Sequence, residues 1–137
     1  MKRITQIVVL IILCSVITLA DEYAVVTNKK MSNLSVSQIR AVFLKKKTFI
    51  DNLTIVPINL EARNSIRQKF EKEILHMSFK RLKAYWIKQH YLGHRPPLTM
   101  KSEDSIKSFL KKVDGSIGYI NIKSVDDNLK VIYKWSD

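Results

Sequence analysis

The sequence predicts an α/β fold: one small domain in which a mostly parallel sheet is flanked by about four helices. Segments rich in β-branched residues alternate along the chain with segments whose apolar residues recur at helical spacing. Strands separated by helices of ordinary length favour βαβ crossovers, and these place neighbouring strands parallel. With 137 residues, 46% of them apolar, the chain can bury one core but not two, and disorder is not expected.

Residues 1–20 have the three-part layout of a secretory signal peptide. A positively charged start at residues 1–3 precedes the unbroken apolar run 7–13, and small residues close the segment. Asp21 is the expected first residue of the mature protein. We therefore expect an exported, periplasmic domain over residues 21–137.

Two other uses of this segment stay open. The first is an uncleaved membrane anchor, for which the apolar stretch is short, because a helix that spans a bilayer needs about 20 apolar residues. The second is lipid attachment at Cys14, where Leu13 is bulkier than the residue expected before such a site. Cys14 is the only cysteine in the sequence, so the mature domain has no disulfide framework.

The strongly basic composition restricts the expected partners. The formal charge is +12, and it falls to +10 when Lys2 and Arg3 leave with the signal peptide. An exported protein meets little nucleic acid, so anionic ligands, lipid headgroups and acidic proteins are the expected partners. Lysine runs at residues 29–30, 45–47 and 111–112 fall at the ends of predicted elements. They are either solvated loops that keep the protein soluble or, if they converge, a contact for an anionic surface.

The first half of the predicted domain contains a strand, a helix and a second strand. Residues 23–27 are rich in β-branched side chains and predict the first strand. The helix begins at Ser35, which forms a capping box with Gln38. Its expected buried face consists of Val36, Ile39, Val42 and Phe43. The second strand covers residues 53–58, where Pro57 indicates the end of the strand or an edge position.

Two helices are predicted next. One begins near Asn64, where Ser65 and Gln68 are spaced to form another capping box. The other is capped by Ser78 and ends at Gly93, because the prolines that follow cannot continue a helix. The apolar residues expected to face the core from these helices are Ile66, Phe70, Ile74, Phe79, Leu82 and Trp86.

The last predicted helix begins at Ser102 and is followed by two strands. Glu103 and Asp104 favour this start, because acidic side chains are stabilising at the positive end of the helix dipole. The expected buried face consists of Ile106, Phe109, Leu110 and Val113. A tight turn then leads into a strand at residues 115–120, and the final strand covers residues 129–133.

The sequence does not predict an enzyme, a metal site or a cofactor. His90 and His94 have the spacing of two metal ligands on one helix face, but Gly93 interrupts the helix between them and no third ligand follows. No serine lies in a nucleophile elbow, and no paired carboxylates stand where they would form a catalytic cleft. We therefore expect a protein that binds rather than reacts.

The densest group of anion-binding features lies where the second predicted helix begins. The first-turn N–H groups of a helix carry positive partial charge and attract anions. Asn64, Ser65 and Arg67 would add side-chain donors to the N–H groups around Ile66 and Arg67. The alternative is that Ser65 only caps the helix and Arg67 is a solvated surface residue.

Several segments, in order, resemble the phosphate-type substrate-binding proteins of ABC transporters, in particular their compact single-domain members. The matching segments are residues 34–44, 55–59, 67–70, 84–86, 93–97 and 115–119. The resemblance covers residues 23–133. It implies one lobe of a type II periplasmic-binding-protein fold.

The resemblance also implies a site at residues 64–67. Full-length relatives bind phosphate partly through a glycine-serine-glycine-threonine-arginine turn. Arg67 matches the arginine and Asn64 stands at the serine, whereas Ser65 replaces a glycine and Ile66 replaces the threonine. One hydroxyl donor is thereby lost, and a side chain stands where backbone could approach a ligand closely.

These implications lead to two functional hypotheses. The first is an exported domain that binds phosphate or another small inorganic anion weakly, because a single lobe leaves half of the anion in water. The second is a non-enzymatic structural module that docks onto a cell-envelope complex. Under the first hypothesis we expect Ser116, in the turn before its strand, to approach the same edge of the sheet, since ligands gather where strands of such folds end.

Overall fold

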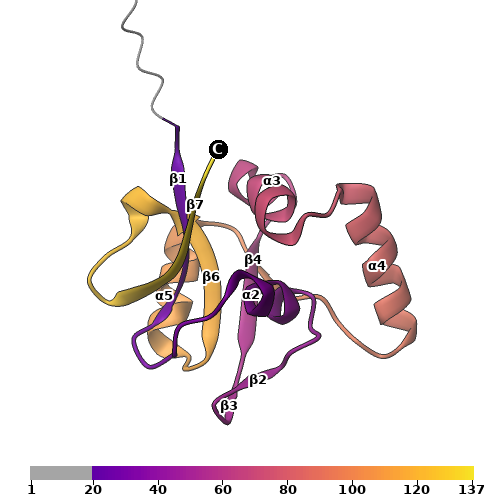
Figure 1. Ribbon diagram of the computed structural model, residues 1–137, viewed down its shortest axis with the longest axis horizontal. Coiled ribbons are helices and arrows are strands. Elements are labelled where there is room, and N and C mark those ends of the chain that lie inside the picture. Colours follow the sequence, from indigo (N-terminus) through magenta and orange to yellow (C-terminus); the bar gives the residue numbers. More distant parts are fainter. Residues whose placement is uncertain (1–19) are drawn as a thin grey trace, which may run out of the picture.

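The computed structural model describes residues 20–137 (Figure 1). Residues 1–19, which hold nearly all of the predicted signal peptide, lie outside the described residues. The elements are β1 (Glu22–Asn28), α2 (Val36–Phe43), β2 (Phe49–Ile50), β3 (Leu53–Thr54), β4 (Val56–Leu60), α3 (Ser65–Phe70), the π-helix η1 (Glu71–Leu75), α4 (Phe79–Tyr91), β5 (Leu98–Met100), α5 (Glu103–Lys112), β6 (Ser116–Asn121), the 3-10 helix η2 (Ile122–Ser124) and β7 (Leu129–Ser136). Among residues 20–137, no helix has both the length and the apolar character needed to cross a membrane.

The main sheet has five strands in the order β5-β4-β6-β1-β7. Strand β4 pairs in parallel with both β5 and β6. Strand β1 pairs antiparallel with both β6 and β7, so β7 points the same way as β4, β5 and β6. The predicted mostly parallel sheet is therefore confirmed, with β1 as the one reversed strand. A separate hairpin, β2-β3, lies beside it.

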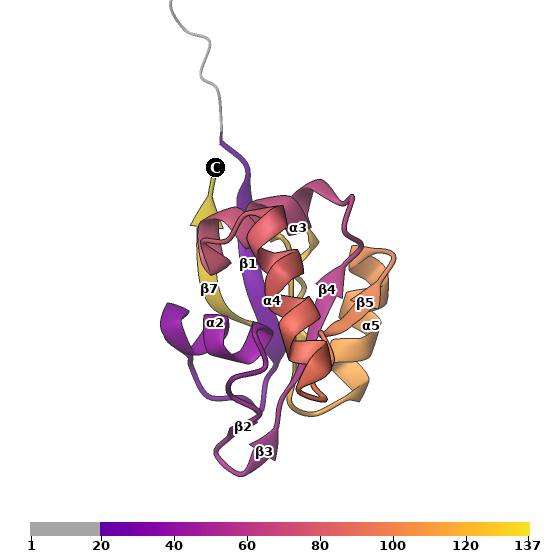
Figure 2. The same ribbon diagram turned by 90° about the vertical axis from the view of Figure 1, so that its right-hand side faces the viewer.

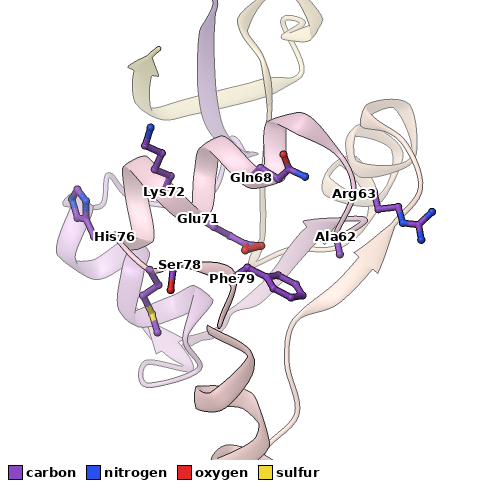
Figure 3. A pocket seen from close by; sticks show the side chains of 9 residues that line it. Ala62, Arg63, Gln68, Glu71, Lys72, His76, Ser78 and Phe79 are labelled. Carbon is purple, nitrogen blue, oxygen red and sulfur yellow. The ribbon is translucent and has the colours of Figure 1, made fainter. Parts of the chain in front are cut away.

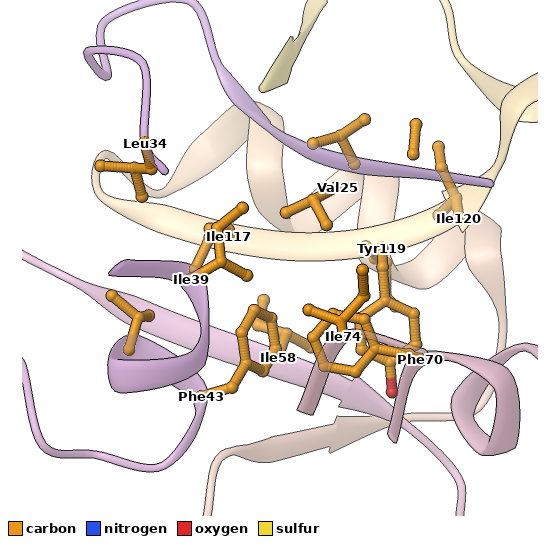
Figure 4. Packing of buried hydrophobic residues seen from close by; sticks show 14 of the residues in the cluster. Val25, Leu34, Ile39, Phe43, Ile58, Phe70, Ile74, Ile117, Tyr119 and Ile120 are labelled. Atoms are coloured by element: carbon orange, nitrogen blue, oxygen red, sulfur yellow. The ribbon is translucent and has the colours of Figure 1, made fainter. Parts of the chain in front are cut away.

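Helices cover both faces of this sheet (Figures 1 and 2). A methyl group added at Gly118 of β6 would meet Ile106 of α5, so α5 packs closely on that face. Successive strand residues point to opposite faces, and Tyr119 accordingly faces α2 and α3. Its ring stacks on Phe70 at a centroid distance of 4.0 Å and lies 5.8 Å from Phe43. These aromatic rings form the centre of the core (Figure 4).

The helix boundaries read from the sequence are largely confirmed. Ser35 and Gln38 form the predicted capping box at the start of α2. Ser78 caps α4 and Ser102 caps α5, each through a hydroxyl that accepts a hydrogen bond from a backbone N–H. Gly93 has φ +83° just after α4, the left-handed conformation that ends many helices.

The start of α3 differs from the prediction. Asn64, not Ser65, is the N-cap residue, and its Oδ1 accepts a hydrogen bond from the N–H of Ile66 at 2.9 Å. The predicted box between Ser65 and Gln68 is therefore wrong, because the capping position lies one residue earlier. The helix then changes to π-helical geometry at Glu71.

The strand predictions were less complete. The predicted strand at 53–58 is divided between β3 and β4, and β4 extends to Leu60. Strand β4 lies inside the sheet, between β5 and β6. Its pairing with β5 begins only after Pro57, so the N–H that proline lacks costs no hydrogen bond to β5. The short strands β2 and β5 were not predicted, since two or three residues give no periodic signal.

Helix α4 packs on the body less than predicted, and it stands apart from the rest of the ribbon in Figure 1. Leu82 is buried as expected, but Trp86 is only half-buried. Phe79 is 70% exposed, so the prediction that it faces the core is wrong. As the first residue of α4 it lines a cavity beside η1 instead of lying beneath the helix.

Candidate anion site at the start of α3

The predicted anion site lies where β4 ends and α3 begins. Strand β4 ends at Leu60, and a short turn leads to Asn64 and the first residue of α3. Ser65 is exposed at this first residue, while Ile66 is half-buried. The N–H of Ile66 donates a hydrogen bond to the cap oxygen of Asn64 and is therefore already used. The other first-turn N–H groups of a helix have no intrahelical acceptor and face outward.

Arg67 is held in place by two hydrogen bonds. Its Nε donates to Oε1 of Glu71 at 2.8 Å, and its Nη1 donates to the carbonyl oxygen of Leu60 at 2.9 Å. The side chains of Arg67 and Glu71 are only 17% and 10% exposed. The alternative interpretation of Arg67 as a solvated surface residue is therefore wrong, because its guanidinium ties α3 to the end of β4.

Behind Arg67 lies a buried polar group that the sequence analysis missed. The Tyr119 hydroxyl donates to Oδ1 of Asn59 at 2.9 Å and accepts from the N–H of Leu60 at 3.2 Å. Burial raises the pKa of Tyr119 far above its ordinary value of 10.0, so the phenol stays neutral. The ion pair of Arg67 with Glu71 is also absent from the sequence predictions. Its spacing of four residues on a helix is nevertheless typical of such pairs.

Ser116 does not belong to this site. It pairs with Val56, the first residue of β4, whereas the site lies beyond Leu60, the last. Ser116 is fully buried, and its Oγ donates to the carbonyl oxygen of Val113 at 2.6 Å. The expectation that it approaches the α3 terminus is wrong, because parallel strands begin at one edge of a sheet and end at the other.

An open cavity of about 870 Å³ lies beside this terminus, between η1 and the start of α4. It is lined by Ala62, Arg63, Gln68, Glu71, Lys72, His76, Met77, Ser78 and Phe79. In Figure 3 the carboxylate of Glu71 and the ring of Phe79 face one another across its centre, and Arg63 points outward at its rim. The carboxylate makes this cavity a poor place for an anion.

The histidine pair gives no metal centre in the described part of the chain. Nδ1 of His94 lies 2.7 Å from Oε1 of Gln89, which places that ring against the end of α4. Among residues 20–137, no group of three or more His, Cys, Asp or Glu side chains is arranged to hold a metal ion.

Comparison with solved structures identifies the fold. An ABC-type phosphate transport receptor from Vibrio cholerae matches 82% of this chain with a TM-score of 0.66 and 20% identity, over 46% of its own length. A protein described as a phosphate ABC transporter substrate-binding protein with bound phosphate, from Clostridium perfringens, matches 82% with a TM-score of 0.67 and 22% identity, over 44% of its length. PstS from Borrelia burgdorferi matches 84% with a TM-score of 0.60 and 14% identity, over 48% of its length.

The chain has a periplasmic-binding-protein-type fold. The resemblance seen in the sequence is thus confirmed as a likeness of fold to phosphate ABC transporter substrate-binding proteins. The chain spans less than half the length of each of these structures, as expected for one lobe. No protein-family model and no curated protein matches the sequence.

Proposed function

We propose that this chain is an exported solute-binding domain that binds phosphate, or another small inorganic anion, weakly at the start of α3. The observation that carries the proposal is the position of Arg67. Its guanidinium is fixed at the N-terminus of a helix, at the carboxyl end of β4, in a fold shared with a receptor that has phosphate bound. Such helix starts favour anions through their N–H groups and dipole.

The chemistry of the site supports weak rather than tight binding. A guanidinium has five N–H donors, and Arg67 uses two of them within the protein. The exposed hydroxyl of Ser65 adds another donor. Glu71, however, offsets the positive charge of Arg67, and an open site is exposed to water of high dielectric constant. We therefore expect a Kd of about 1 mM, which corresponds to roughly −4 kcal/mol.

The decisive experiment is an NMR titration of the exported protein with phosphate, sulfate and acetate at low ionic strength. We expect the amide signals of residues 65–67 to shift in a saturable manner. Ser65→Asp should abolish the shifts, because a carboxylate at the exposed first position of α3 repels an anion but suits the helix dipole. Ser105→Asp, in the first turn of α5, is the matched control. No saturable shift at 10 times the expected Kd would refute the proposal.

Export is proposed on the layout of residues 1–20 and on where the fold begins. Strand β1 starts at Glu22, and the backbone oxygen of Asp21 accepts a hydrogen bond from the N–H of Asp137. Cleavage before Asp21 would therefore keep this hydrogen bond and the whole of β1. Mass spectrometry of the protein recovered from the periplasm should give a chain that starts at Asp21. An intact Met1 in the membrane fraction would contradict export as a cleaved protein.

The second hypothesis, a module that docks onto an envelope complex, is favoured by the surface of α4. Ile87 and Tyr91 are 53% and 85% exposed there, and Leu92 after the helix is 60% exposed. Large apolar side chains grouped on a surface often mark a protein contact. Replacing Ile87 and Tyr91 by serine should leave the stability unchanged and release the protein from any envelope complex. A wild-type protein that migrates as a free monomer in a gentle envelope extract would count against docking.

A further inference from the structure

A second cavity adjoins the one beside Glu71, and the two share His76 and Met77, which follow η1. It has a volume of about 540 Å³ and lies between the end of α2, η1 and α4. It is lined by Arg40, Leu44, Lys46, Leu75, His76, Met77, Arg81, Ala84, Tyr85 and Lys88. Apolar side chains form its floor, of which Leu44 and Leu75 are buried in the domain core. Figure 2 shows α2 beside α4, the two helices whose residues line the groove.

The rim of the groove carries positive charge without compensation. Four of the ten lining residues are lysine or arginine, and none is acidic. The five ion pairs within residues 20–137 all use other cations. The groove thus differs from the start of α3, where Glu71 offsets Arg67. Cations gathered around low-dielectric walls repel one another and concentrate anions.

Hydrogen bonds between its walls hold the groove in shape. Nε of Arg40, from α2, donates to the carbonyl oxygen of Ile74 in η1 at 2.5 Å. The Tyr85 hydroxyl, from α4, donates to the carbonyl oxygen of Leu44 at the end of α2 at 2.6 Å. The ammonium of Lys46 lies 5.9 Å from the centre of the Tyr85 ring. A ligand would therefore meet a preformed site, which lowers the entropic cost of binding.

We propose that this groove binds a small anion that carries an apolar group, such as an alkyl phosphate. The anionic group would lie among Arg81, Lys88 and the free end of Arg40, and the apolar group would cover the floor. The volume falls in the range of about 300–1,000 Å³ that is usual for small-molecule sites. An inorganic anion would leave the floor uncovered, and a neutral amphiphile would leave the cations without a partner.

Calorimetry with three probes tests this ligand class, on the exported protein carrying Ser65→Asp so that inorganic phosphate does not bind at the start of α3. Octyl phosphate, kept below its micelle concentration, should bind about tenfold more tightly than inorganic phosphate and than octyl glucoside. Equal binding of octyl glucoside would show that the cations contribute nothing. Equal binding of inorganic phosphate would show that the floor contributes nothing. Either result, or no binding of octyl phosphate, overturns the proposal.

Paired variants on α4 locate the binding. Arg81→Gln with Lys88→Gln removes two exposed rim cations and should weaken octyl phosphate binding about tenfold. The matched control is Lys80→Gln with Lys83→Gln, which makes the same charge change on the same helix outside the groove. If both double variants lose octyl phosphate affinity equally, the effect comes from net charge alone and the proposed site is wrong. Ser65→Asp should leave this binding unchanged, so the groove and the α3 site can fail independently.

Discussion

Removing the guanidinium of Arg67 should destabilise the fold strongly. Arg67→Ala leaves the carboxylate of Glu71, whose side chain is 10% exposed, without its cation. It also leaves the carbonyl oxygen of Leu60 without the donor that binds it at 2.9 Å. Breaking a buried ion pair by removing one partner costs about 3–5 kcal/mol. Because neither side chain is completely buried here, we expect the lower end, about 3 kcal/mol.

This loss would be a large share of the stability of a domain of this size, since such domains unfold with about 5–15 kcal/mol. Urea unfolding at pH 7, followed by circular dichroism, measures the free energy of unfolding directly. Arg63→Ala is the matched control, because Arg63 is an exposed arginine at the rim of the neighbouring cavity. We expect that control to change the stability by no more than about 0.5 kcal/mol.

A double variant separates the cost of losing the ion pair from the cost of leaving the carboxylate of Glu71 without a cation. Replacing both Arg67 and Glu71 by methionine removes the orphaned carboxylate and should recover most of the loss, because apolar replacements of buried pairs are often neutral. Two results would refute the reasoning. One is an Arg67→Ala protein as stable as Arg63→Ala. The other is a double variant no more stable than Arg67→Ala.

Three further predictions concern the fold. Gly115→Ala should destabilise far more than Gly93→Ala in urea unfolding: both residues have φ near +80°, but only at Gly115 would the added methyl collide with the backbone oxygen of Thr54. Trp86→Ala should cost about 1–2 kcal/mol, below the range of about 3–5 for a fully buried aromatic, because its ring is half-buried; a larger loss would place the ring in the core. Above pH 10 the tyrosines of the unfolded state ionise, while Tyr119 stays protonated in the folded state, so the free energy of unfolding should fall as pH rises. This fall should be less steep in Tyr119→Phe when urea midpoints are compared from pH 8 to 11.

Helix boundaries could be predicted because they depend on neighbouring residues. The capping box of Ser35 and Gln38 and the left-handed Gly93 are decided within one turn of the chain. The same locality explains the error at α3, where Asn64 and Ser65 are both good caps and only the path of the preceding turn selects between them. The fold class followed from the alternation of strands and helices.

Contacts between distant segments could not be predicted in this way. The sequence predicts Ser116 near the α3 terminus. In the structure Ser116 pairs with the first residue of β4 rather than the last, so it lies at the other end of that strand from the site. The hydrogen bond from Tyr119 to Asn59 joins residues sixty positions apart, and no local pattern records it. The exposure of Phe79 likewise depends on how far α4 stands from the body.

Glu71 links the stability of the site to its affinity, and one substitution tests that link. The carboxylate orders Arg67, yet it also repels an anion that approaches the start of α3. Glu71→Gln keeps a side-chain oxygen that can accept the hydrogen bond from Nε of Arg67 and removes the negative charge. At the effective dielectric constant of a protein surface, a charge several ångströms away changes binding by about 1 kcal/mol, or roughly fivefold. We therefore expect phosphate to bind about five times more tightly to Glu71→Gln in NMR titrations, while the free energy of unfolding falls because the ion pair is lost. Gln68→Glu, one turn earlier on the exposed side of α3, should act in the opposite direction on affinity. Unchanged or weaker phosphate binding by Glu71→Gln would show that the anion does not approach Arg67.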